Sequence, residues 1–256
     1  MYTHLPRPTI FAHRGASAYA PENTLSAFEM AVKQKADAIE FDVKLSSDDQ
    51  VVVIHDQTIG RTTNGTGRVK DLPLAALQEM DAGSFFDVAY KGEPIPTLSQ
   101  VFEALGMKIF FNIELTSYSS PSDSLPERVA ELVNFYGLEK NILFSSFHPQ
   151  VLRRIHRLMP TVPIGFLADH GISGILARSW LGKFLVDYQA LHPELRDANR
   201  AFINRIHQAG QRVHVYTVNQ VMDMQRLYSI GVDGIFTDDP RLARDTLVSS
   251  LGAIPP

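Results

Sequence analysis

The fold of this chain is decided by a short unit, which reads ELRDANRAFINRIHQAGQRVHVYTV over residues 194–218. Between Glu194 and Ala209, apolar side chains recur at the three- and four-residue spacing of a helix with one apolar face. Gly210 follows, a residue type that can end a helix in the left-handed conformation. Arg212–Val218 then has the composition of a strand. The pattern predicts a helix, a turn and a strand in direct succession.

This unit recurs along the chain. Glycines also follow the helical segments that end before Gly106, Gly137 and Gly231, and another amphipathic helix is expected at Asn23–Lys35. Strands are expected at Thr9–His13, Ala38–Lys44, Lys108–Glu114, Asn141–Ser146, Pro163–Leu167, Phe184–Tyr188, Arg212–Val218 and Gly234–Thr237. Eight strands alternating with helices in 256 residues predict an α/β protein, a (β/α)8 TIM barrel. Because no Gly-x-Gly-x-x-Gly follows the first strand, an open Rossmann-like sheet is the less favoured alternative.

One step between strands is much longer than the others. After the second strand, Val51–His55 is an extra apolar run that we expect to pair with it as a hairpin. The segment from about residue 56 to 97 follows and is rich in glycine and proline. Long loops are usually functional, and in a barrel the loops that follow strands lie at the active-site end. We therefore predict a single barrel domain over residues 1–256, with a cap inserted at 56–97 between strands two and three.

Composition excludes several classes of protein. The chain has a net charge of −4 and no cysteine, which excludes disulfides, thiolate nucleophiles and cysteine-ligated metal sites. A pI near 6.1 argues against nucleic acid as a partner. The sequence shows neither a signal peptide nor an apolar run of membrane-spanning length, so we expect a cytoplasmic protein without stable membrane insertion.

Acidic residues interrupt the apolar alternation of the second predicted strand, which reads AIEFDVK. Period two places Glu40 and Asp42 on one face, which points into the barrel. Glu114 ends the third strand, and the ends of parallel strands gather at one rim. Three poorly solvated carboxylates repel one another, and one hard divalent cation, Mg²⁺ or Ca²⁺, is the natural compensation. Surface carboxylates on an edge strand are the alternative interpretation of the first pair.

Two histidines are expected at the same rim. His13 ends the first strand, His55 ends the hairpin strand, and Arg14 directly follows His13. Arginine presents a fork of donors to an anion. Two imidazoles beside a cation suit displacement at a phosphodiester, in which one accepts a proton from the nucleophile and the other protonates the leaving alkoxide. A purely structural role at the strand ends is the alternative.

These residues belong to motifs that occur in order along the chain: His13-Arg14-Gly15, Pro21-Glu22-Asn23-Thr24, Glu40-x-Asp42, His55-Asp56, Glu114, Thr217-Val218-Asn219 and Thr237-Asp238-Asp239-Pro240. In this order the chain resembles the glycerophosphodiester phosphodiesterases, from about Ile10 to Pro240. Its size is similar to that of the small cytoplasmic bacterial members. The resemblance implies a barrel enzyme that hydrolyses glycerophosphodiesters to sn-glycerol 3-phosphate and an alcohol, with a small-molecule substrate and a divalent cation.

The resemblance also implies a role for each matching residue. It implies a set of metal ligands, namely Glu40, Asp42 and Glu114. It implies an acid–base pair, His13 and His55, and a phosphate contact, Arg14.

Two positions depart from the family's pattern. Many members have lysine two residues after the third-strand glutamate, where this chain has Thr116, so that Arg14, the cation or Lys44 must supply more positive charge. Tyr216 stands where tryptophan is frequent and keeps a flat wall for substrate. His192, which precedes a proline near a predicted strand end, is a further candidate for substrate binding.

Three other polar residues are expected near helix starts. Asn23 could cap the first helix. Of Asp238 and Asp239, which follow the last strand, one is expected to cap the final helix and the other is free to support the site.

Three alternative functions remain open. One is a related phosphodiesterase that acts on phospholipids or lysophospholipids and releases a cyclic phosphate, although no basic amphipathic helix is seen. Another is a non-catalytic barrel that binds phosphate esters, against which the intact pair of histidines argues. The third is a metal-dependent aldolase or isomerase, which would need a base on later strands. The preferred alcohol, the metal, the oligomeric state and the assignment of acid and base to the two histidines are not determined by the sequence.

Overall fold

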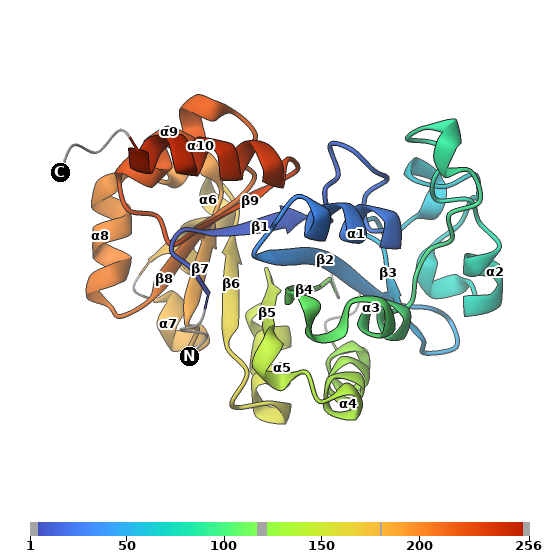
Figure 1. Cartoon of the computed structure of the whole chain (residues 1–256). Coiled ribbons are helices and arrows are strands. Elements are labelled where there is room, and N and C mark those ends of the chain that lie inside the picture. The colour runs from blue at the N-terminus through green and yellow to red at the C-terminus, as the bar shows by residue number, and fades with distance from the viewer. Residues whose placement is uncertain (1–4, 117–121, 180, 253–256) are drawn as a thin grey trace.

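The computed structural model describes residues 5–116, 122–179 and 181–252. Within them, eight parallel strands form a closed barrel with helices around it (Figure 1). The barrel strands are β1 (Thr9–His13), β2 (Ala38–Leu45), β4 (Phe110–Leu115), β5 (Ile142–Ser146), β6 (Ile164–Ala168), β7 (Ala190–Pro193), β8 (Arg212–Val215) and β9 (Gly234–Thr237). β1 pairs with both β9 and β2, which closes the sheet. The predicted TIM barrel is confirmed, and the open sheet is excluded.

The helices around the barrel are α1 (Leu25–Lys33), α3 (Leu98–Leu105), α4 (Leu125–Tyr136), α5 (Pro149–Leu158), α6 (Ile172–Arg178), α7 (Gly182–Leu185), α8 (Arg200–Gln208), α9 (Val221–Ser229) and α10 (Pro240–Gly252). Short 3-10 helices are η4 (Gly106–Lys108), η5 (Glu139–Asn141) and η6 (Leu195–Asp197). The four glycines predicted to end helices all take a positive φ: Gly106, Gly137, Gly210 and Gly231. None of the helices in the described ranges has the length and apolar character needed to span a bilayer.

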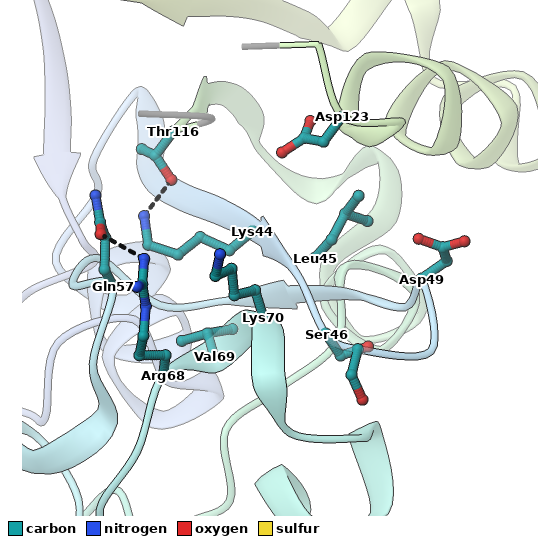
Figure 2. A pocket seen from close by; sticks show the side chains of 11 residues that line it. Lys44, Leu45, Ser46, Asp49, Gln57, Arg68, Val69, Lys70, Thr116 and Asp123 are labelled. Atoms are coloured by element: carbon teal, nitrogen blue, oxygen red, sulfur yellow. Dashed lines mark hydrogen bonds between the residues drawn. The ribbon is translucent and has the colours of Figure 1, made fainter. Parts of the chain in front are cut away.

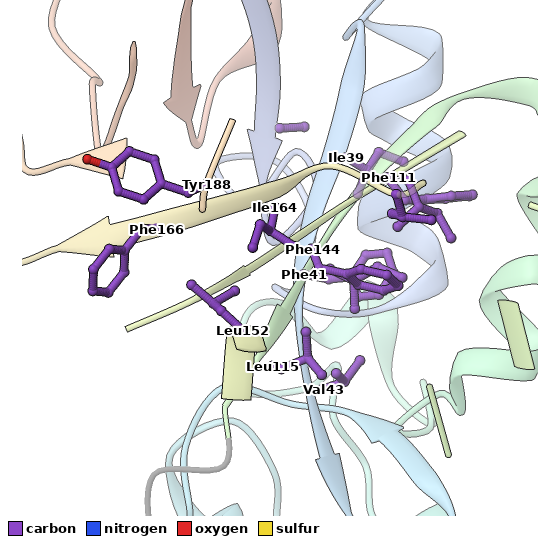
Figure 3. Close-up of a cluster of buried hydrophobic side chains, with 14 of the residues drawn as sticks. Ile39, Phe41, Val43, Phe111, Leu115, Phe144, Leu152, Ile164, Phe166 and Tyr188 are labelled. Atoms are coloured by element: carbon purple, nitrogen blue, oxygen red, sulfur yellow. The ribbon is translucent and has the colours of Figure 1, made fainter. Parts of the chain in front are cut away.

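The apolar side chains of the strands point outward, into the layer between the sheet and the helices. On β2, Ile39, Phe41 and Val43 are buried in this layer, part of which is shown in Figure 3. The ring of Phe41 packs 5.4 Å from that of Phe28 on α1, measured between centroids. Because side chains alternate along a strand, burying these apolar residues turns the acidic residues between them into the barrel.

The seventh strand lies later in the chain than predicted. The strand expected at Phe184–Tyr188 is wrong, because Phe184 lies in the short helix α7 and is 77% exposed. β7 begins at Ala190 and has the sequence ALHP. It contains no β-branched residue, and its histidine and proline are not typical of strands, so its composition does not indicate a strand. Its pairing with β6 and β8 identifies it as a strand. The helix predicted over 194–209 is likewise two elements, η6 and α8, with Asn199 as the cap of the second.

The long step after β2 contains the predicted hairpin and an insert of short helices. β3 (Val51–Val53) pairs antiparallel with β2 but ends before His55. Residues 56–97 form η1 (Ile59–Arg61), η2 (Val69–Asp71), α2 (Leu74–Gln78) and η3 (Val88–Tyr90), at one side of the barrel beside β3 (Figure 1). They share a small apolar cluster with the hairpin: Val52, Ile54, Ile59, Val69, Leu77, Ala82 and Ile95.

The insert is joined to the barrel next to α1. The hydroxyl of Ser26 donates to Glu93 at 2.8 Å, and the hydroxyl of Tyr90 donates to the carbonyl of Tyr19 at 3.0 Å. These contacts hold the insert against the loop that leads from β1 into α1, which carries several of the polar residues described next.

Candidate active site

Three buried carboxylates meet at the carboxyl ends of neighbouring strands. Glu40 and Asp42 lie on the inner face of β2, and Glu114 lies on β4 in register with Asp42. One oxygen from each carboxylate lies within 4.8 Å of the others, and each residue is at most 9% exposed. The structure therefore brings the three predicted metal ligands together.

The protein compensates these charges only in part. Burial raises the pKa of Glu40 well above its ordinary value, and the charges of Asp42 and Glu114 raise it further. The backbone N–H of Arg14 donates to Glu40 Oε2 at 2.9 Å, and Arg14 Nε lies 3.5 Å from Asp42 Oδ2. A set of carboxylate oxygens with surplus negative charge fits a hard divalent cation.

Asn23 orients one of these carboxylates. Its side-chain amide donates to Asp42 Oδ2 at 3.0 Å from a backbone with a φ of 59°, a conformation that asparagine tolerates. The prediction that Asn23 caps the first helix is wrong, because Thr24 caps α1 and accepts from the N–H of Ala27 at 3.3 Å. The left-handed turn at Asn23 directs its amide toward β2 instead.

His13 is held by a carboxylate from the far end of the chain. Its Nδ1 hydrogen-bonds Asp238 Oδ1 at 2.7 Å, and Asp238 also accepts from Asn219 at 2.6 Å and from Ser17 at 3.1 Å. Burial by itself would raise the pKa of Asp238, but these hydrogen bonds and the charge of His13 lower it. An ionised Asp238 fixes the ring through Nδ1 and leaves Nε2 as the other ring nitrogen.

His55 has the same type of partner. Its Nδ1 hydrogen-bonds Asp56 Oδ1 at 2.6 Å, and Arg61 Nε donates to Asp56 Oδ2 at 2.6 Å. Although burial opposes ionisation, the hydrogen bonds from Arg61 and His55 lower the pKa of Asp56 to about 2. Both histidines therefore present one ring nitrogen to the pocket and one to a carboxylate.

Arg14 is fixed by a carboxylate that it shares with the insert. Arg14 donates to Glu22 Oε1 at 2.8 Å, and Arg61 donates to both oxygens of Glu22 at 2.8 Å. Burial opposes ionisation of Glu22, but the hydrogen bond from Arg61 and the charge of Arg14 bring its pKa to about 2. Through Arg61, the insert thus supports both Arg14 and the partner of His55.

One pocket contains these groups. Its lining consists of His13, Arg14, Glu40, His55, Asn112, Glu114, Ser145, Phe147, Leu167, Tyr216, Thr217 and Phe236. Asn112 donates to Ser145 Oγ at 2.8 Å, whereas the buried Asn112 Oδ1 has no hydrogen-bond partner among the residues described. A buried acceptor of this kind suits a hydroxyl group of a ligand. Tyr216 forms part of the wall, edge-on to Phe147 with 6.1 Å between ring centroids.

His192 does not reach this pocket. It is fully buried on β7, with its Nε2 at 3.2 Å from Nδ1 of His214. Its ring fills the space left by Gly165, where a Cβ would lie 2.4 Å from the ring. Burial lowers the pKa of His192 to about 3, so the ring is neutral at physiological pH. The structure places this residue in the packing of the barrel interior.

The sequence by itself indicates no site role for some of the supporting residues. Asp56 and Glu22 belong to the motifs quoted above. The position of Asp56 next to His55 and that of Glu22 near Arg14 are the sequence features that point to a supporting role. The contact of Arg61 with Glu22 has no local signal, because the two residues lie 39 positions apart, although Asp56, its other partner, lies five positions away. The two acids after β9 divide their roles as predicted: Asp239 accepts from the N–H of Leu242 at 2.8 Å at the start of α10.

Comparison with known proteins gives consistent similarities. The sequence model of the Glycerophosphoryl diester phosphodiesterase family matches residues 13–242. The chain is 38% identical over 232 residues to the glycerophosphodiester phosphodiesterase of Caldanaerobacter subterraneus subsp. tengcongensis, which covers 90% of this chain and 94% of that protein.

Solved structures agree with this similarity. An Oleispira antarctica phosphodiesterase in complex with the product sn-glycerol-3-phosphate has a TM-score of 0.83 and 31% identity, over 98% of this chain and 99% of that one. The glycerophosphodiester phosphodiesterase of Agrobacterium tumefaciens has a TM-score of 0.81 and 29% identity, over 93% and 99% of the two chains.

Proposed function

This chain belongs to the glycerophosphoryl diester phosphodiesterase family and hydrolyses glycerophosphodiesters, and we propose that a divalent cation, two histidines and an arginine carry out the reaction. The products are sn-glycerol 3-phosphate and an alcohol. The observation that carries the proposal is that His13 and His55 line the same pocket as the carboxylate cluster, each with its Nδ1 on an aspartate.

Glu40, Asp42 and Glu114 are the residues that would hold the cation. Their buried, mutually repelling oxygens match the preference of Mg²⁺ or Ca²⁺ for carboxylate ligands. When bound, the cation neutralises negative charge on the carboxylates and on the phosphoryl oxygens.

The other residues of the pocket bind the substrate and transfer protons. Arg14, anchored on Glu22, binds a non-bridging oxygen of the phosphate. One histidine accepts a proton from the attacking water through its Nε2, and the other donates a proton to the alkoxide as the bond from phosphorus to that oxygen breaks. Asn112 Oδ1 accepts from a hydroxyl of the glycerol half, and Tyr216 lines the pocket wall.

The test is hydrolysis of glycerophosphocholine with and without a divalent cation. We expect activity with Mg²⁺ or Ca²⁺, loss with EDTA, and recovery when the cation is added back. His13→Ala and His55→Ala should each lower kcat by about 10²–10⁴. His156→Ala, on the outer helix α5, is the matched control and should retain activity.

Two outcomes would contradict the mechanism. Turnover that is unaffected by EDTA removes the role of the cation, and near-normal kcat in both histidine variants removes the acid–base assignment. Phosphorus NMR of early products distinguishes direct attack by water from a route through a cyclic phosphate, the alternative left open by the sequence. Fractionation of the native host tests the proposed cytoplasmic location.

A further inference from the structure

A second pocket lies beside the active site, and three cationic side chains line it. They are Lys44 of β2 and two residues of the insert, Arg68 and Lys70. Lys44 is 7% exposed, while Arg68 and Lys70 are exposed. In Figure 2 the three gather on one side of the pocket, and the acidic residues Asp49 and Asp123 lie on the other.

This pocket continues the wall of the active site. Lys44 follows Asp42 on the same face of β2, Thr116 follows Glu114 by two residues, and Gln57 follows His55 by two residues. Because a strand rises about 3.3 Å per residue, Lys44 stands about 7 Å along β2 from the nearest carboxylate of the metal cluster. A substrate with two halves can therefore reach from one pocket into the other.

Lys44 and Arg68 each donate a hydrogen bond to a neutral side chain, and Lys44 also lies near the charges of Asp42, Glu114 and Asp56. Lys44 Nζ donates to Thr116 Oγ1, and Arg68 donates to Gln57 Oε1 at 3.4 Å (Figure 2). Within the described parts of the chain, neither Arg68 nor Lys70 takes part in a salt bridge. On the acidic side, Asp49 lies 3.8 Å from Arg128, which offsets its charge. Arg68 and Lys70 thus make one side of the pocket positively charged, and Asp49 and Asp123 lie on the opposite side.

We propose that this pocket binds a negatively charged group, a carboxylate or a second phosphate, on the alcohol half of the glycerophosphodiester. The proposal rests on the proposed function. The inner pocket offers Asn112 to the hydroxyl groups of the glycerol half, and Arg14 meets the reacting phosphate. The alcohol half then extends past Glu114 and His55 toward Lys44, Arg68 and Lys70. The structure thereby selects anionic alcohols over cationic ones such as choline.

The experiment compares two substrates in the presence of Mg²⁺ at low ionic strength. The serine half of glycerophosphoserine carries a carboxylate beside an ammonium group, whereas the choline half of glycerophosphocholine carries only a cation. The variant Arg68→Gln/Lys70→Gln removes two charges of the pocket. The matched control is Lys33→Gln/Lys140→Gln, which removes two exposed charges beside the amino ends of the barrel strands. We expect the pocket variant to lower kcat/KM for glycerophosphoserine by about fivefold, through KM, and to change it less than twofold for glycerophosphocholine. Added salt should reduce the difference.

Glycerophosphoinositol 4-phosphate replaces glycerophosphoserine in a second arm, to distinguish a phosphate from a carboxylate as the bound group. Equal losses for the anionic and cationic substrates, no loss in the pocket variant, or an equal loss in the control variant would overturn the inference while leaving the proposed function intact. If no glycerophosphodiester is turned over, the proposed function fails by itself. Calorimetric binding of glycerophosphoserine and glycerophosphocholine then decides the inference, which fails if the pocket variant keeps the wild-type ratio of affinities.

Discussion

Each of the two imidazoles in the pocket, His13 and His55, hydrogen-bonds a neighbouring carboxylate through its Nδ1. Asp238 holds His13 from the loop after β9, and Asp56 holds His55 from the next position in the chain. An ionised aspartate on Nδ1 selects the tautomer whose Nε2 can accept or donate the transferred proton, and it stabilises the imidazolium when it forms. In the proposed mechanism the two aspartates are therefore positioning residues.

Replacing one of these aspartates should therefore affect the chemical step. Asp56→Asn is expected to lower kcat by about 10–100-fold with little change in KM, because the amide no longer selects the productive tautomer. Steady-state kinetics on glycerophosphocholine measure both constants. Asp71→Asn, at an exposed position in the same insert, is the control and should keep the wild-type kcat. A merely structural role would be indicated if Asp56→Asn lowered thermal stability while leaving the kcat of the folded protein unchanged.

At the scale of elements, the packing of β6 against β7 shows how one strand accommodates its neighbour. Gly165 of β6 pairs with Ala190 of β7, and the ring of His192 occupies the space beside it. A Cβ on Gly165 would lie 2.4 Å from two atoms of that ring, which is shorter than van der Waals contact allows. The glycine in this strand is thus explained by close approach of a side chain.

Gly165→Ala should consequently destabilise the barrel. We expect the free energy of unfolding to fall by about 1–3 kcal/mol, the usual cost of overpacking, as measured by urea denaturation. Gly60→Ala is the control, because a Cβ there would meet its nearest neighbour at 3.5 Å. In the double variant Gly165→Ala/His192→Ala, the two changes should be less than additive. Strict additivity would show that the clash with His192 is not the cause.

For the whole molecule, the closed barrel creates an interior that water does not reach. His192 and His214 are both fully buried there, and burial lowers the pKa of each, for His192 to about 3. The charge of Arg212 and the neighbouring imidazole lower that of His214 further. In the unfolded chain, both histidines would return to an ordinary pKa near 6.5.

This difference predicts how stability depends on pH. Below about pH 6.5 the unfolded chain binds protons that the folded barrel does not, so the free energy of unfolding should fall as the pH is lowered, by up to about 1.4 kcal/mol per pH unit for each histidine. Well above pH 6.5 both histidines are neutral in the folded and in the unfolded chain, so the free energy of unfolding no longer changes through their titration. Urea denaturation between pH 7.5 and 5 measures the slope.

His192→Asn/His214→Asn should flatten this slope, and His156→Asn, on the outer helix α5, should leave it unchanged. An equally steep slope in the double variant would mean that other groups bind the protons. Asp56 and Glu22, whose pKa values lie at about 2 in the folded protein, return to ordinary values near 4 on unfolding, so they add to the slope only toward pH 5.

Much of this molecule follows from local sequence. The alternation on β2 is sufficient to place Glu40 and Asp42 inside the barrel, because a period of two residues is a property of any strand with one apolar face. The glycines that end helices are likewise predictable from local sequence, because the positive φ at a helix end involves only the last turn of that helix. The repetition of these short patterns identifies the barrel. The rim is identified by His13 and Glu114 at the ends of β1 and β4, whereas His55 lies two residues after the end of β3.

Only the tertiary structure decided the rest, because it depends on partners that are distant in sequence. β7 is identified as a strand by its pairing with β6 and β8 and not by its residue composition. His192 lies within the barrel because of a gap at Gly165, and Asn23 turns to Asp42 rather than to its own helix. The amino-acid sequence by itself determines which chemical groups are available and on which face of an element each lies. Closure of the barrel determines which of those groups meet, because it brings strands from the two ends of the chain into contact.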